Sequence, residues 1–155
     1  MSDKAKGWVY VLIQGFLFVV IVFSSAFERK YLIHPYNKFI SYIGIVLVFT
    51  GVLLFLTALI NFGQKITPNP VPKETYELRT TGLYSIVRHP MYFSFLILFT
   101  GAPLYFNAYF SLVWIIMLFI FFVSKTKLEE RYLSEKFPEY KQYQLTTKRL
   151  IPSVY

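Results

Sequence analysis

Most of the polar side chains that could do chemistry lie in three short stretches of an otherwise apolar chain. In chain order these are residues 76–92 with Tyr84, Arg88, His89 and Tyr92, the stretch with Lys125, Glu129 and Glu130, and the tail 137–152 with Tyr140 and Tyr143. Basic side chains bind anions, carboxylates accept hydrogen bonds from hydroxyls, and tyrosine rings offer flat faces to a purine or a cation. A ligand with a carboxylate, a cationic centre, a ribose and a purine would use all of these groups.

Pro90 is expected to begin a helix, because proline fits the first helical turn, where its missing N–H costs nothing. Arg88 and His89 then stand just before a helix start, beside unpaired backbone N–H groups and the positive end of the helix dipole. Such a position suits an anionic group, for example a carboxylate or a phosphate. Glu129 is expected at the same membrane depth, where it would add a carboxylate to the site.

Each of these residues also has an ordinary structural explanation when it is taken alone. Arg88 could be an interfacial anchor, and Tyr84 and Tyr92 could belong to an aromatic belt at the membrane surface. Lys125 and Glu129 are four residues apart and could form a simple surface ion pair. The combination, rather than any single residue, favours a binding site.

Long uncharged runs predict an all-α integral membrane protein, built as a single domain over residues 1–155. Of its 155 residues, 55% are hydrophobic and 15% are charged, and the mean hydropathy is +0.48. About 20 apolar residues cross a bilayer core as a helix, so about four transmembrane helices are expected. The expected spans are 8–27, 39–62, 91–106 and 108–124, the last continuing as a helix to about residue 137, with a loop at 63–90 and a tail at 138–155.

The last two spans are expected to form a C-terminal helical hairpin. Gly101, Pro103 and Asn107 favour a turn around residues 102–108. In the second span, Gly44 and Gly51 could allow a neighbouring helix to approach closely.

Basic residues divide unevenly between the two sides of this arrangement. Both termini and the loop 63–90 carry thirteen Lys and Arg, against three on the opposite side. Basic segments tend to stay in the cytoplasm, so both termini and this loop are expected there, and the loop and tail would form the cofactor site. The same distribution accounts for the net charge of +8, and no nucleic-acid partner is expected.

Several other kinds of site are not indicated. The sequence has no cysteine, so it offers no disulfide, no thiolate metal site and no cysteine nucleophile. His34 and His89 are predicted on opposite sides of the membrane, and no metal is expected. The glycine-rich nucleotide motifs and the serine elbow of hydrolases are absent.

Four ordered motifs resemble the isoprenylcysteine carboxyl methyltransferase family of integral membrane methyltransferases. They are "LRTTGLYSIVRHPMY", "LEERYL", "FPEYKQY" and "RLIP", and they cover about residues 76–152. That family is related to the phospholipid N-methyltransferases and includes many prokaryotic members. The resemblance implies a helical methyltransferase without a Rossmann domain, placed in the cytoplasmic membrane of a prokaryote, with S-adenosylmethionine as its cofactor.

The resemblance also implies which residues form the site. The cofactor-binding set that it implies is Tyr76, Glu77, Leu78, Arg79, Tyr84, His89, Pro90, Met91, Tyr92 and Glu129. Arg88 is added to this set because of its expected place just before a helix start. The catalytic set is Lys125, Glu129 and Glu130, with Glu130 assisting an amine acceptor. Lys125 stands where the family has an arginine, and it keeps the charge without the bidentate fork. Ser94 and Pro138 stand where glycine is usual.

The acceptor implied by this comparison is a lipid or a small hydrophobic molecule with a carboxylate or an amine. Two other functions remain possible for the same helical core. One is a small non-catalytic membrane protein that retains the fold, and the other is a membrane reductase that uses a nicotinamide cofactor. No set of residues favours a nucleotide diphosphate over S-adenosylmethionine, which favours the methyltransferase.

Overall fold

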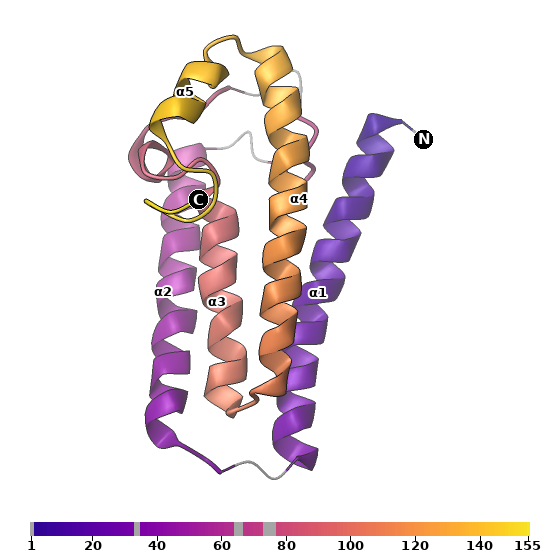
Figure 1. Ribbon diagram of the computed structural model, residues 1–155, viewed down its shortest axis with the longest axis vertical. Helices are drawn as coiled ribbons and strands as arrows, with labels where there is room; N and C mark the ends of the chain where they lie inside the picture. Colours follow the sequence, from indigo (N-terminus) through magenta and orange to yellow (C-terminus); the bar gives the residue numbers. More distant parts are fainter. Residues whose placement is uncertain (1, 33–34, 64–66, 73–76) are drawn as a thin grey trace.

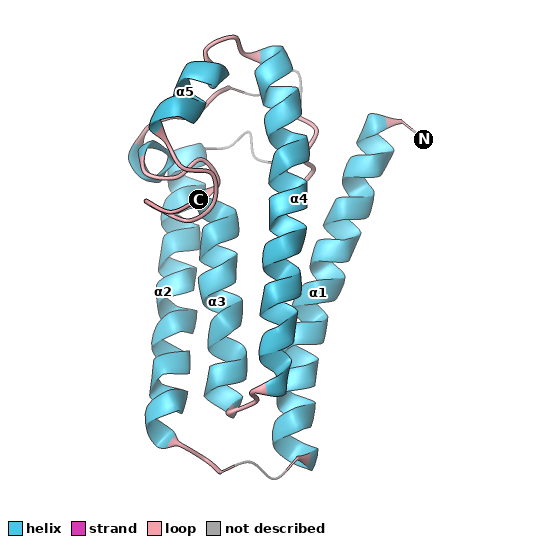
Figure 2. Cartoon of the chain, in the orientation of Figure 1, coloured by secondary structure: helices cyan, strands magenta, loops and turns pink. Residues whose placement is uncertain are grey.

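Helices account for most of the chain. The computed structural model describes residues 2–32, 35–63, 67–72 and 77–155. In these ranges the elements are α1 Asp3–Tyr31, α2 Lys38–Phe62, the 3₁₀ turn η1 Gly82–Ser85, α3 Pro90–Phe106, the 3₁₀ turn η2 Phe110–Leu112, α4 Val113–Lys136 and α5 Tyr140–Thr146. The described residues form no strand, only a single bridge between Val87 and Lys148 (Figure 2). The all-α class predicted from the sequence is confirmed.

The four long helices form a bundle whose one end is covered by the tail. Helix α3 packs between α2 and α4, and α1 packs against α3 and α4. Figure 1 shows α5 and the C-terminal segment folded back over the end of the bundle where α3 begins. The segments that carry the predicted site therefore meet at this end.

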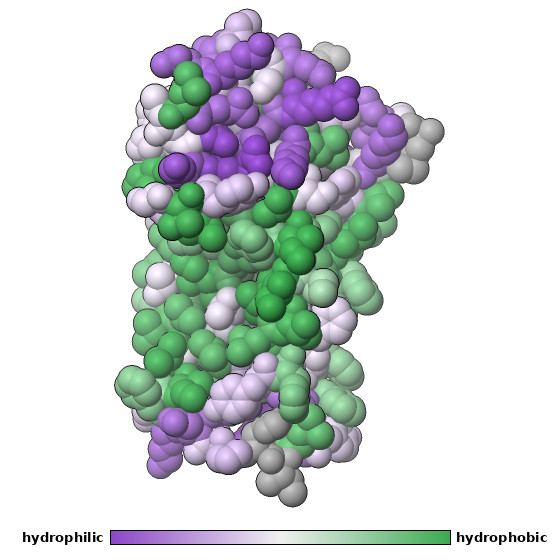
Figure 3. All heavy atoms as spheres, viewed as in Figure 1, coloured by the Kyte–Doolittle hydropathy of each residue, from purple (hydrophilic) through white to green (hydrophobic). Residues whose placement is uncertain are grey.

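The surface of the bundle is apolar over most of its length. Figure 3 shows a broad hydrophobic band between two hydrophilic ends, with the larger hydrophilic region around α5. Three of the described helices are long and apolar enough to cross a membrane, namely Asp3–Tyr31, Lys38–Phe62 and the continuous stretch Phe110–Lys136. Helix α3 is apolar but shorter, at 17 residues. These features are those of an integral membrane protein.

The hairpin between α3 and α4 turns at Asn107, and Gly101 and Pro103 lie inside α3. Helix α3 runs through Gly101 and Pro103, and Asn107 ends it in the left-handed conformation, with φ of 54°. The backbone N–H groups of Asn107 and Ala108 bond to the carbonyls of Leu104 and Pro103, at 3.1 and 2.8 Å. These bonds satisfy the last carbonyls of the helix, so a tight turn at Asn107 suffices and Pro103 does not end α3.

Glycines bring α2 and α3 into backbone contact. A Cβ atom on Gly44 would lie 2.3 Å from the backbone N of Tyr105, and one on Gly51 would lie 2.6 Å from the Cβ of Leu98. On the facing helix, a Cβ on Gly101 would lie 2.6 Å from the carbonyl O of Gly44. Only glycine leaves room for this approach, which fixes the position of α3 and of the residues at its start.

The start of α4 is held by a carboxylate from α1. Glu28 is buried and accepts hydrogen bonds from the backbone N–H groups of Phe110 and Ser111, at 3.0 and 2.8 Å. The Ser111 hydroxyl donates to the same side chain at 2.7 Å. Because Glu28 satisfies the unpaired N–H groups at this helix start, it fixes α4 relative to α1.

Candidate functional site

A cavity of about 210 Å³ lies at the end of the bundle that α5 covers. Its walls come from α1, α2, the segment 67–72, residues 78–92, α4 and α5. These parts are distant in the sequence, and their meeting point is where the bundle passes from its apolar band to its hydrophilic end (Figures 1 and 3). The cavity thus has both polar and apolar residues in its wall.

Helix α4 presents three different side chains to this cavity. Lys125, Glu129 and Leu133 all line it and stand four residues apart. Positions at this spacing share one face of a helix, with about 6 Å between neighbours along the axis. Along the wall the order is therefore a cation, a carboxylate and an apolar group.

Lys125 is completely buried. Its Nζ donates to the Oε1 of Gln14 at 2.6 Å and to the carbonyl O of Pro68 at 3.1 Å. The same Nζ lies 5.0 Å from the centre of the Tyr92 ring. Lys125 is therefore not part of a surface ion pair, but an ammonium group held inside the protein between α1 and the segment 67–72.

Glu129 stands between two residues from the start of α3. Its Oε2 accepts a hydrogen bond from the Tyr92 hydroxyl at 2.9 Å and lies 3.8 Å from the Nδ1 of His89. A carboxylate has two oxygens with about four lone-pair sites. Glu129 can therefore accept further hydrogen bonds from hydroxyl or amine groups inside the cavity.

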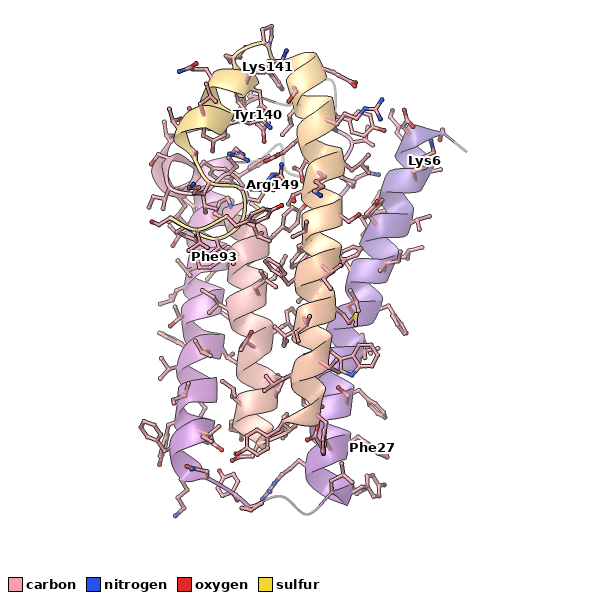
Figure 4. The ribbon with its side chains drawn as sticks, in the orientation of Figure 1. Lys6, Phe27, Phe93, Tyr140, Lys141 and Arg149 are labelled. Atoms are coloured by element: carbon pink, nitrogen blue, oxygen red, sulfur yellow. The ribbon has the colours of Figure 1, made fainter. Side chains whose placement is uncertain are left out.

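Glu130 does not line the cavity but lies in an ion-pair network next to it. It accepts from the Nε atoms of Arg88 and Arg149, at 2.7 and 2.9 Å, and from the Nε2 of His89, at 3.3 Å. Figure 4 shows Arg149 turned from the tail toward α4. Burial works against the charge of Arg149, but the hydrogen bonds and the charge of Glu130 raise its pKa. Buried cations and a buried carboxylate thus compensate one another.

Arg88 ties the same network to the tail. Its Nη1 donates to the carbonyl O of Gln144 at 3.2 Å and to that of Thr147. The backbone N–H groups of Arg88 and His89 bond to the carbonyls of Lys148 and Arg149, at 2.8 and 3.1 Å. The start of α3, the middle of α4 and the tail are therefore locked into one unit.

The structure brings most of the predicted site residues to the cavity wall. Those that line it are Leu78, Arg79, Tyr84, Arg88, His89, Pro90, Met91, Tyr92, Lys125 and Glu129. Glu77 and Glu130 are not among the lining residues; Glu77 pairs with Arg79 at 3.0 Å on the exposed surface. Tyr76 lies outside the described residues. The position of Glu130 does not support a role in accepting a proton from an acceptor.

Sequence reasoning missed several residues that shape the cavity. Gln14 holds Lys125 across 111 positions of sequence, and Leu133 lines the cavity beside the tyrosines of α5. Gln14 carried a signal, because it is a lone amide in an apolar run. Leu133 and Phe95 carried none, since apolar residues on membrane helices have no distinguishing pattern.

Metal binding is not indicated by the part of the chain that the structure describes. Its His, Asp and Glu residues form no group of three or more that could hold a metal ion.

Comparison with known proteins gives one family and several relatives. The phospholipid methyltransferase family model matches residues 39–140. The chain is 32% identical over 101 residues to protein-S-isoprenylcysteine O-methyltransferase B of Arabidopsis thaliana, covering 63% of the chain and 51% of that protein. It is 36% identical over 121 residues to methanethiol S-methyltransferase 1 of Bradyrhizobium diazoefficiens, covering 73% and 40%. A methanethiol S-methyltransferase of Pseudomonas deceptionensis is 37% identical over 112 residues, with coverage of 67% and 42%. The chain spans about half the length, or less, of these curated relatives.

Proposed function

The chain belongs to the phospholipid methyltransferase family, and we propose that it is a membrane methyltransferase that uses S-adenosylmethionine to methylate a hydrophobic or lipid-like acceptor. The observation that carries this proposal is the cavity in which Lys125, Glu129 and Leu133 face the start of α3. A carboxylate, a buried cation and aromatic side chains line this cavity, and they support the proposal because S-adenosylmethionine carries charged groups, hydroxyls and a flat base.

The residues around Glu129 fit the cofactor by their chemistry. His89 and the first N–H groups of α3 would hold its carboxylate, because a helix start favours an anion. Glu129 would accept hydrogen bonds from its ribose or amino group, and Tyr92 would offer a ring face to its cationic sulfur. When bound, this group supplies an activated methyl on a sulfonium. The task left to the protein is alignment, which can contribute ~7–11 kcal/mol to a two-substrate reaction.

Lys125 would define the acceptor end of the cavity. Its ammonium is buried 5.0 Å from the centre of the Tyr92 ring, and Phe55 and Phe95 also line the cavity. A buried positive charge favours an acceptor that reacts as an anion, and it opposes one whose product gains a positive charge. A carboxylate or a thiolate therefore suits this site better than an amine. The names of the relatives, an isoprenylcysteine O-methyltransferase and methanethiol S-methyltransferases, give oxygen and sulfur as the methylated atoms.

Arg88, Glu130 and Arg149 would take no part in binding the acceptor. Their charges are used within the protein to join α3, α4 and the tail. We assign them the role of positioning His89 and the start of α3. In this arrangement the shorter helix α3 crosses the membrane as well, together with the three longer helices. The loop and the tail face the cytosol, and the acceptor enters from the bilayer.

The first test is calorimetric titration of detergent-purified protein with S-adenosylhomocysteine. Micromolar binding is expected, and Glu129→Gln should weaken it at least tenfold, because a charge-assisted hydrogen bond is lost. Glu135→Gln is the matched control, since Glu135 lies on the exposed face of α4 and pairs with Arg131. Absence of binding in a folded, monodisperse sample would indicate a non-catalytic membrane protein.

The acceptor is tested with a labelled methyl donor and long-chain thiols, carboxylic acids and primary amines in detergent. Transfer to the thiol or the acid is expected. Preferential methylation of the amine would contradict the role given to Lys125.

A further inference from the structure

The hydroxyl of Tyr140 is a buried polar group that has no hydrogen-bond partner among the described residues. Tyr140 is the first residue of α5 and is 1% exposed, and Figure 4 shows its side chain reaching from α5 toward α4. The next tyrosine of α5 differs, because the Tyr143 hydroxyl donates to the backbone carbonyl of Tyr84. Buried polar groups in folded proteins are nearly always hydrogen-bonded. Tyr140 is also one of the residues that line the cavity, so a ligand bound there would supply the partner that this hydroxyl lacks.

The surroundings of Tyr140 select the kind of group that it can bind. Tyr140 lines the cavity together with Leu133 and Tyr143, which form an apolar wall. Burial, followed by the negative charges of Glu130 and Glu129, raises the pKa of the Tyr140 phenol above its usual value. The hydroxyl therefore remains a proton donor, and the carboxylates oppose an anionic ligand group beside it. A neutral acceptor atom on a flat, largely apolar group meets both conditions.

We propose that Tyr140 binds the purine of the S-adenosyl group, with its hydroxyl donating to a ring nitrogen. This inference rests on the proposed function and adds the end of the cavity at which the base lies. Purine ring nitrogens are neutral acceptors, and the flat base packs well on aromatic and aliphatic side chains. Leu133 stands eight residues beyond Lys125, about 12 Å along α4. The base is thus held at the end of the cavity farthest from the acceptor.

The test compares wild type and Tyr140→Phe in titrations with S-adenosylhomocysteine and its 1-deaza, 3-deaza and 7-deaza analogues. Each analogue replaces one ring nitrogen by a C–H group. Tyr140→Phe should weaken binding of S-adenosylhomocysteine about tenfold, as expected for one lost hydrogen bond. One of the analogues should bind wild type about tenfold more weakly than S-adenosylhomocysteine does. The same analogue should bind Tyr140→Phe as it binds wild type, because the hydrogen bond from the Tyr140 hydroxyl to that ring nitrogen is already absent. Tyr42→Phe is the control, since Tyr42 is an exposed residue of α2.

The outcomes separate this inference from the function on which it rests. If wild type binds S-adenosylhomocysteine and Tyr140→Phe binds it equally well, the purine assignment is wrong while the proposed cofactor stands. The purine assignment is also wrong if the analogue that binds wild type more weakly loses just as much affinity in Tyr140→Phe. If wild type does not bind, both are overturned. Tyr140→Phe should unfold at the same temperature as wild type or higher, because it removes an unpaired buried hydroxyl; a lower temperature would reveal a partner within the protein and contradict the inference.

Discussion

Glu129 and Glu130 are neighbours in sequence but have different surroundings, because successive residues of a helix are rotated by about 100°. Glu130 is buried among Arg88, His89 and Arg149, so its charge compensates cations of the protein itself. Glu129 lines the cavity and accepts a hydrogen bond from Tyr92. Loss of the Glu130 carboxylate should therefore lower the stability of the fold, and loss of the Glu129 carboxylate should weaken ligand binding.

Replacement of Glu130 by glutamine tests this division. Glu130→Gln leaves the guanidinium of Arg88 buried without a countercharge, and the free energy of unfolding should fall by about 3 kcal/mol. The loss of stability is measured as a lower unfolding temperature in detergent. Glu129→Gln is the neighbouring control, and little change in its unfolding temperature is expected. Equal unfolding temperatures for the two variants would show that the network around Glu130 is not needed for stability.

Part of this site could be predicted from residues and part could not. The charged and aromatic residues near Pro90 and in the stretch that contains Glu129 were recognisable by their motifs. Which of two adjacent glutamates faces the cavity depends on the rotation of α4 in the bundle, and a sequence does not specify that rotation. The contact between Gln14 and Lys125 joins α1 to α4, and such a contact arises only when the whole bundle packs.

At the scale of the helices, the contact between α2 and α3 decides where the site residues at the start of α3 stand. Gly44 and Gly101 meet at this contact with no space for a side chain. Because both helices are rigid, a small displacement at the glycines moves the far end of α3, including His89, relative to α4. The alignment of the cavity therefore depends on glycines that lie outside it.

Gly44→Ala should destabilise the protein and weaken cofactor binding. Its Cβ would lie 2.3 Å from the backbone of Tyr105, so the helices must separate, at a cost of about 1–3 kcal/mol. Gly15→Ala is the matched control on α1, because nothing lies within 4 Å of the Cβ position there. Alanine at that site should be neutral or stabilising by up to about 1 kcal/mol. The measurements are unfolding temperature and the dissociation constant of S-adenosylhomocysteine. A Gly44→Ala protein that matches Gly15→Ala in both would exclude a role for close helix contact.

The helices themselves were the most predictable part of the fold, since long apolar runs leave few alternatives in a membrane. The turn of the hairpin was less predictable. Gly101, Pro103 and Asn107 all favoured a turn, but Gly101 and Pro103 lie inside α3, and the left-handed Asn107 with its hydrogen bonds sets the end. The hydrogen bonds from the start of α4 to Glu28 could not be predicted either, because Glu28 and its partners lie more than 80 residues apart in the sequence.

At the scale of the whole molecule, the cavity is complete only when the tail folds back onto the bundle. Tyr140 and Tyr143 close it from α5, and Leu150 is buried in the apolar core formed by α1, α3 and α4. Arg149 bonds to Glu130 and fixes the tail over this end. A ligand that needs the closed cavity should therefore stabilise the attached tail. Loss of the contacts that hold the tail should weaken binding of this ligand.

Hydrogen–deuterium exchange of residues 140–155 measures this coupling. Arg149→Met removes the ion pair that holds the tail, so exchange there should become about tenfold faster or more, because a hydrogen-bonded charge pair opposes local opening. Arg131→Met is the control, since Arg131 forms an exposed pair with Glu135. S-adenosylhomocysteine should slow exchange of the tail in wild type, because a ligand that binds the closed form shifts the equilibrium toward it. If Arg149→Met leaves exchange unchanged and binds the ligand as wild type does, the pair between Arg149 and Glu130 is not needed to hold the tail or to close the cavity.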